Sequence, residues 1–90
     1  MERTFSNPTV VEFRTEKHCN LHIEGAGSVQ LYKRSGGTGW SYLTTLAGQV
    51  IDEDIVVNTP KDIRIVFVQK PSLVAVTLNE GETIDIDIQD

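Results

Sequence analysis

The sequence has few of the features that mark disulfide-rich, secreted or membrane proteins. Cys19 is its single cysteine, so no internal disulfide can stabilise a chain of 90 residues, whose stability must come from its core or from other chains. The longest apolar run, residues 63–68, is interrupted by Arg64 and is far shorter than the roughly 20 residues that cross a bilayer. The first eight residues lack the apolar centre of a signal peptide. We therefore expect cytosolic synthesis and no membrane span.

Basic clusters and helical patterns are also scarce. Lys33 and Arg34 form the only adjacent basic pair, the net charge is −5, and residues 79–90 contain acids but no Lys or Arg. Nucleic acid is therefore not an expected partner, because its phosphates need clustered positive charge. No stretch of the chain carries a convincing i, i+3, i+4, i+7 apolar pattern, so little helix is expected.

The most informative stretch runs from residue 28 to residue 45, SVQLYKRSGGTGWSYLTT. Val29 and Leu31 alternate with the polar Gln30 and with Tyr32, as in a half-buried strand. The glycines at 36, 37 and 39 supply positions that tolerate positive φ and can reverse the chain. This pattern predicts a β-hairpin.

Short alternating segments recur along the rest of the chain. The expected strands are 9–14, 19–24, 28–33, 40–45, a short one at 55–57, then 63–68, 73–78 and 83–88. Residues 25–27 are expected to turn the chain between the second and the third of these. Because short connections join antiparallel neighbours, we predict an all-β fold, an antiparallel β-sandwich of about seven to eight short strands, immunoglobulin-like or jelly-roll-like. Residues 9–90 form its single domain and residues 1–8 an N-terminal arm.

Residues that could bind metal do not have suitable spacing. On a strand, His18 and His22 lie about 13 Å apart on one face, and Cys19 points to the opposite face. The acids at 52–54 lack the glycine and distal glutamate of a calcium loop, and the alternate acids among 85, 87 and 90 are about 7 Å apart along a strand, too far to chelate alone. We predict no metal site, with Cys19 buried and both histidines at the surface.

No set of residues predicts catalysis or a cofactor. The glycines at 36–39 have no following helix and no lysine after them, so they do not form a phosphate-binding loop. No serine lies in a nucleophile elbow, and Cys19 has no base and orienting acid in a recognisable arrangement. We predict that the protein is not an enzyme.

The aromatic residues Tyr32, Trp40 and Tyr42 leave three interpretations open. Trp40 can pack in the core with the two tyrosines half-exposed, the rings can anchor a protein partner, or they can stack on a sugar. Across an antiparallel hairpin the three can be neighbours.

The segment from Leu21 to Leu78 resembles the small, immunoglobulin-like β-sandwich structural proteins of tailed bacteriophages, which form head decorations and tail or neck modules. The resemblance rests on an LHI strand, a glycine turn, the VQLYKR strand, the SGGxGW turn, a Pro60-led strand with Arg64 among apolar residues, and a final strand over 72–78. The family usually has a glycine after the proline, where this chain has Lys61.

The resemblance implies a non-enzymatic virion component, assembled in the host cytoplasm, that binds capsid or tail proteins and copies of itself. We expect Phe5 of the arm, Tyr32, Trp40 and Tyr42 to lie at such protein interfaces. The alternative is a carbohydrate-binding or adaptor module that uses Tyr32, Trp40 and Tyr42.

Overall fold

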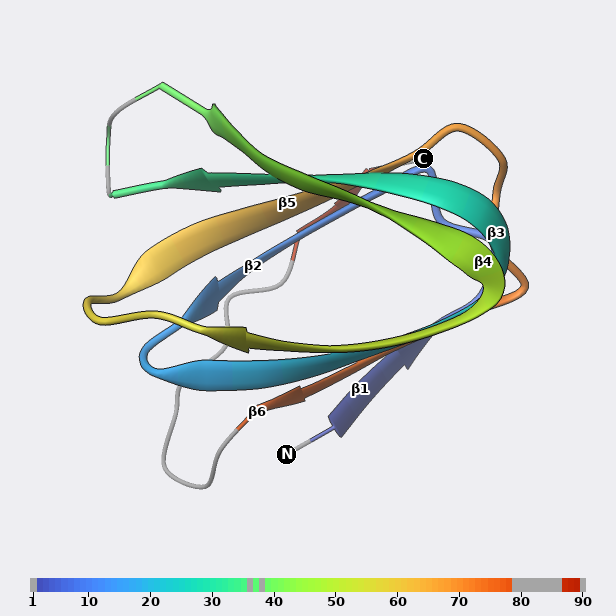
Figure 1. Ribbon diagram of the computed structural model, residues 1–90, viewed down its shortest axis with the longest axis horizontal. Coiled ribbons are helices and arrows are strands. Elements are labelled where there is room, and N and C mark those ends of the chain that lie inside the picture. Colours follow the sequence, from blue (N-terminus) through green and yellow to red (C-terminus); the bar gives the residue numbers. More distant parts are fainter. Residues whose placement is uncertain (1, 36, 38, 79–86, 90) are drawn as a thin grey trace.

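The computed structural model describes residues 2–35, 37, 39–78 and 87–89, and every regular element in them is a β-strand (Figure 1). The strands are β1 (Glu2–Phe5), β2 (Val10–Thr15), β3 (His18–Arg34), β4 (Ser41–Val56), β5 (Lys61–Phe67), β6 (Leu73–Leu78) and β7 (Asp87–Gln89). All pairings between them are antiparallel. The predicted all-β, antiparallel fold class is therefore confirmed.

Strand β3 lies at the centre of the sheet. One of its edges pairs with β4 along nearly its whole length, whereas the other edge is shared between β6, along the first half of β3, and β5, along the second half. β1 extends the sheet beyond β6, and β2 and then β7 extend it beyond β5. The seven-stranded sheet consequently curls into two layers, which Figure 1 shows from the side. We call the layer of β1 and β6 the lower layer and that of β2, β5 and β7 the upper layer.

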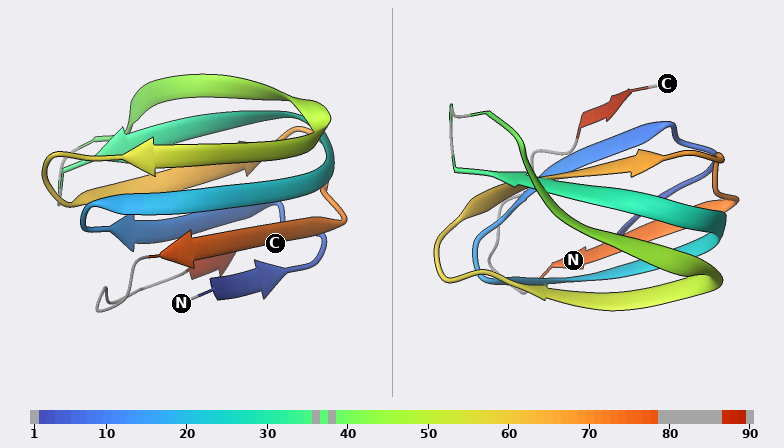
Figure 2. Two further views of the ribbon diagram at one scale, coloured as in Figure 1. Left: turned by 60° about the horizontal axis from the view of Figure 1, so that its bottom comes forward. Right: turned by 45° about the horizontal axis from the view of Figure 1, so that its top comes forward.

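Glycines produce the bend that carries β3 and β4 from one layer to the other (Figure 2). The register of β3 against β4 shifts between Glu24 and Gly27, and Gly27 then lies opposite Gly48. Gly25, Gly27 and Gly48 have φ values of 82°, 76° and 139°, a range that L side chains rarely adopt. Both strands therefore bend at the same level, and the pairing continues past the bend.

Two loops also cross between the layers, and hydrogen bonds connect both of them to this bend. The backbone amide of Ser72 donates to the carbonyl of Glu24 at 2.9 Å, which connects the β5–β6 loop to β3. The amide of Asn7, a residue with a φ of 55°, donates to the carbonyl of Pro71 at 3.0 Å and connects the β1–β2 loop to the same place. The three crossings therefore support one another at this end of the molecule.

The inward-facing side chains of both layers form one hydrophobic core. Its largest fully buried apolar side chains are Leu21, Ile23, Leu31, Ile63 and Ile65. Burial of such a side chain contributes about 1.5–3 kcal/mol. The apolar strand β5 lies between β3 and β2 in the sheet.

Residues 25–27, which were expected to turn the chain, and the acidic residues 52–54 both lie inside strands. Residues 25–27 bend β3 without reversing the chain, and residues 52–54 belong to β4. The cause is the long hairpin, whose pairing runs from His18 opposite Val56 to Lys33 opposite Ser41. The acids are tolerated because their side chains are exposed on a strand that, among the described residues, pairs with β3 alone.

The N-terminal segment also differs from the expected arm. Residues Glu2–Phe5 form β1, which pairs with β6 from Glu2 opposite Thr77 to Phe5 opposite Val74. Phe5 is 8% exposed and packs in the core. The strand expected at 83–88 lies mostly outside the described residues, within which Asp87–Gln89 forms β7 beside β2. Gly36 of the predicted turn also lies outside them.

Candidate functional site

The structure brings three of the four predicted interface residues together on the outside of the upper layer. Tyr32 of β3 lies directly opposite Tyr42 of β4, and Trp40 immediately precedes β4. Phe5 belongs to the lower layer and faces the core. The predicted set therefore divides into an aromatic cluster and one core residue.

A β-bulge places the two tyrosines on the same side. The register shifts between Leu31 and Tyr32, so that Leu31 lies opposite Thr44 and Tyr32 opposite Tyr42, with Leu43 as the extra residue. The tyrosine ring centroids are 6.0 Å apart with an angle of 74° between the planes, an edge-to-face pair. Tyr42 remains 59% exposed, which leaves much of its ring accessible to a partner.

Trp40 contacts two arginines. The guanidinium carbon of Arg34 lies 4.3 Å from the centroid of the indole ring, and that of Arg64 lies 4.5 Å from it. Both distances are within the range of a cation–π interaction. The indole is therefore half-buried against charged side chains of the outer surface, and not in the core.

The arginines are held in turn by acids of neighbouring strands. Arg64 pairs with Glu12 at 2.7 Å, whereas Arg34 at 2.9 Å and Arg14 at 3.4 Å share the carboxylate of Asp62. The strand register aligns these residues across β2, β5 and β3. We call the surface of Arg14, Tyr32, Arg34, Trp40, Tyr42 and Arg64 the Trp40 face.

No role in the site was predicted for these arginines from the sequence. The signal that could have found them is the alternation itself, since Arg14 and Arg64 each lie one residue away from inward-facing residues of β2 and β5. The contact between Arg64 and Trp40 could not be predicted, because it depends on the order of the strands.

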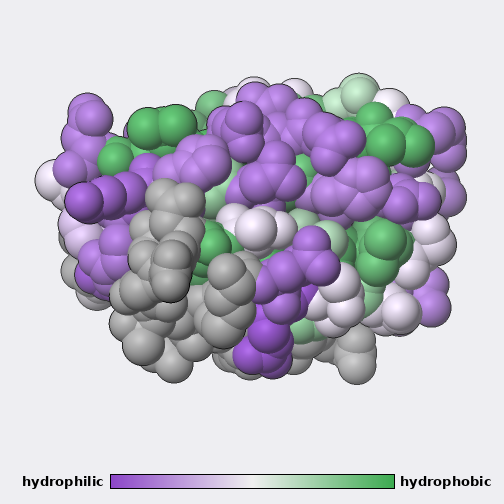
Figure 3. Space-filling view, turned by 90° about the horizontal axis from the view of Figure 1, so that it is seen from below, coloured by the Kyte–Doolittle hydropathy of each residue, from purple (hydrophilic) through white to green (hydrophobic). Residues whose placement is uncertain are grey.

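The outside of the lower layer carries histidines and acids instead. The ring of His22 lies 2.7 Å from Glu24 through Nε2 and 2.7 Å from Asp52 through Nδ1. These hydrogen bonds, first that with Glu24 and then that with Asp52, raise the pKa of His22 above its ordinary value of 6.5. Seen from below, hydrophilic side chains predominate and hydrophobic ones occupy small separate areas (Figure 3).

A second group on the same face is centred on Asp54. The Nδ2 group of Asn20 donates to Oδ1 of Asp54 at 3.0 Å, and His18 Nε2 lies 3.3 Å from the same oxygen. The bond from Asn20, followed by that of His18, lowers the pKa of Asp54 below its ordinary value. The polar side chains of this face thus satisfy one another.

Residues of the types that coordinate metals also occur in this layer. Cys19 is buried in the core between the outward-facing His18 and Asn20 of β3, as its strand position predicted. Among the described residues, no three His, Cys, Asp or Glu side chains are arranged to hold a metal ion.

Comparisons with known proteins find no matching family model, no similar curated protein and no matching solved structure. Within the described part of the chain, no helix has the length and hydrophobicity required to cross a membrane.

Proposed function

We propose that this protein is a non-enzymatic structural component that binds other proteins through the Trp40 face. The observation that carries the proposal is the composition of this face. Tryptophan, tyrosine and arginine are the residues most enriched among those that dominate binding energy at protein interfaces. Here one Trp, two Tyr and three Arg gather on one side of one layer.

The anchoring of these side chains also supports the proposal. Long arginine side chains lose conformational entropy when they are fixed at an interface. Arg34 and Arg64 are already held by Asp62 and Glu12 and by the indole of Trp40, so less entropy remains to be lost on binding.

We further propose that the assembly is the virion of a tailed bacteriophage, as the sequence resemblance implies. The chain would then be assembled in the host cytoplasm onto capsid or tail proteins, in repeated copies that also contact one another. A small domain without an internal disulfide suits this role, since binding to the native state stabilises it.

Carbohydrate binding is the alternative function for Tyr32, Trp40 and Tyr42. A sugar ring stacks on a flat aromatic surface, whereas the planes of the two tyrosines meet at 74°. The geometry therefore favours a protein partner over a glycan. Saturable binding on a glycan array that is lost in Trp40→Ala would reverse this preference.

Mass spectrometry of purified particles tests the proposal. Particles released by cells that express the chain from its native locus should contain it in a fixed ratio to the major capsid or tail protein. A ratio that stays constant through successive density gradients is the expected result. Loss of the chain during purification, or its absence from the particles, would contradict the virion role.

A further inference from the structure

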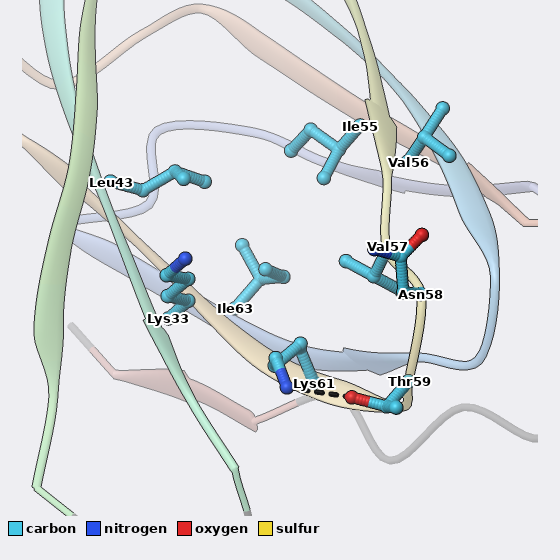
Figure 4. Close-up of a pocket in the computed structure, with 9 residues that line it drawn as sticks. All are labelled: Lys33, Leu43, Ile55, Val56, Val57, Asn58, Thr59, Lys61 and Ile63. Atoms are coloured by element: carbon cyan, nitrogen blue, oxygen red, sulfur yellow. Dashed lines mark hydrogen bonds between the residues drawn. The ribbon is translucent and has the colours of Figure 1, made fainter.

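A hollow lies between the two layers at the end of the molecule opposite the glycine bend. Its volume is about 330 Å³, and it is formed by the end of β3, both ends of β4, the loop after β4 and the start of β5 (Figure 4). We call it the end pocket. The Trp40 face lies on the outside of the sheet and does not contribute to it.

The wall of the end pocket is aliphatic. Leu43 and Ile55 from β4, Val57 from the following loop and Ile63 from β5 point into a common space (Figure 4). Ile55 and Ile63 are buried in the core, and Leu43 and Val57 are partly buried against it. An apolar group that enters the pocket would therefore extend the core.

Two lysines also line the end pocket. Lys61 Nζ donates to Thr59 Oγ1 at 2.7 Å and to Ser35 Oγ at 2.8 Å, which fixes the ammonium group and uses two of its three donors. Lys33 comes from the neighbouring strand (Figure 4). Among the described residues, neither lysine forms an ion pair with a carboxylate.

The charge of the end pocket contrasts with its surroundings. The chain has a net charge of −5, yet the charged residues that line this pocket are both cationic. An adjoining hollow of about 220 Å³ shares Leu43 and Ile55 but is lined by Glu53 and Asp54. Of these two hollows in the described part of the chain, the end pocket is the one that combines positive charge with an aliphatic wall.

We propose that the end pocket binds an aliphatic carboxylate, with the hydrocarbon chain between the layers and the carboxylate between Lys33 and Lys61. Its volume is at the lower end of the ~300–1,000 Å³ range of ligand pockets. If each carbon takes about the 30 Å³ that a water molecule occupies, the pocket holds about ten carbons. The ligand class is therefore a medium-chain fatty acid. This inference is independent of the protein-binding role.

Octanoate and octanol test the proposal because they differ only at the head group. Isothermal titration calorimetry at low salt should give saturable binding, with a Kd for octanoate about three- to fivefold lower than for octanol, since one exposed ion pair contributes up to about fivefold. In methyl-labelled protein, octanoate should shift the signals of Leu43, Val57 and Ile63.

Substitutions at exposed or partly exposed positions test the contribution of the lysine charges to binding without disrupting the fold. The double variant K33Q/K61Q should reduce the preference for octanoate over octanol to less than about twofold. The matched control Lys70→Gln changes a lysine outside the pocket and should keep the preference. Val57→Phe should block binding of both ligands, whereas Val68→Phe, at an exposed site outside the pocket, should not.

Three results would overturn the proposal. The first is the absence of saturable octanoate binding at millimolar concentrations in the folded wild type. The second is equal affinity for octanol and octanoate. The third is a preference for octanoate that persists in K33Q/K61Q, because the two lysines would then not be the groups that bind the carboxylate.

Discussion

Trp40 illustrates how single residues shape this surface. Its indole is placed by two guanidinium groups, which are themselves held by Glu12 and Asp62. Replacement of Trp40 therefore changes both the stability of the fold and the surface offered to a partner.

Trp40→Leu should lower the free energy of unfolding by about 1 kcal/mol, because it removes two partly exposed cation–π contacts. Urea denaturation measures this change, and a double-mutant cycle with Arg64→Gln should give a coupling energy of about 0.5–1 kcal/mol. Tyr42→Leu is the matched control and should have a smaller effect, since Tyr42 is 59% exposed and the cation–π contacts found among the described residues both involve Trp40. A coupling energy near zero would show that the indole does not interact with the arginine.

His22 makes stability depend on pH. Because its pKa is raised in the folded state, its stabilising effect is complete below the ordinary value of 6.5 and is lost as pH rises through the folded pKa. The difference in unfolding free energy between wild type and His22→Gln should therefore be larger at about pH 5.5 than at about pH 9.

The matched control for His22 is Glu53→Gln, an exposed acid on β4 that makes no contact with the ring. NMR titration of Glu24→Gln should show a lower pKa for His22, because Glu24 is the main cause of the increase. A difference between wild type and His22→Gln that grows with pH would have the wrong sign and would refute the assignment.

Among the elements, the bend in β3 and β4 determines the layered shape. It requires positive φ at Gly25 and Gly27, but the two positions differ in their surroundings. A Cβ added at Gly25 would lie 3.1 Å from Ser72 Oγ and 3.3 Å from Ser72 N, whereas one at Gly27 would meet nothing within 4 Å.

Gly27→Ala should cost about 1 kcal/mol, the penalty for a left-handed alanine. Gly25→Ala should cost more, about 2–3 kcal/mol, because the added methyl also disturbs the hydrogen bonds from Ser72 to Glu24. Thermal and urea unfolding of both variants measure the difference. Equal losses would mean that the contact with Ser72 is unimportant for the bend.

The same elements show how far the sequence could predict the fold. Period-two alternation located the inward-facing residues of β2, β3 and β5, because these strands pair on both edges and have one face in the core. Alternation cannot distinguish a turn from a bend when glycines occur at 25 and 27. It also could not place β1, whose position depends on pairing with β6, 69–75 residues away in the sequence.

The candidate site, like the fold, could be predicted in part from the sequence. Tyr32, Trp40 and Tyr42 belong to one local hairpin, so their proximity followed from sequence. Arg14 and Arg64 come from β2 and β5, and only the strand order brings them beside the hairpin. Phe5 was predicted to lie at an interface of the arm, because nothing near it in sequence indicated that pairing with β6 would bury it against the core.

For the whole molecule, the two layers present different chemistry to their surroundings. The upper layer exposes aromatic rings and arginines with balancing acids, and the lower layer exposes histidines and acids. A protein with two distinct faces can bind a larger assembly with one face and leave the other in solvent. Our proposal places the binding role on the Trp40 face.

The most direct test is co-sedimentation of the purified chain with particles that lack it. Wild-type chain should bind saturably, and Tyr42→Ala should bind at least about fivefold more weakly, because truncating an interface anchor costs more than about 1 kcal/mol. Val50→Ala, which shortens an exposed side chain of the lower layer, should bind like wild type. Equal binding by all three proteins, or weaker binding by Val50→Ala alone, would contradict the assignment of the Trp40 face as the binding surface.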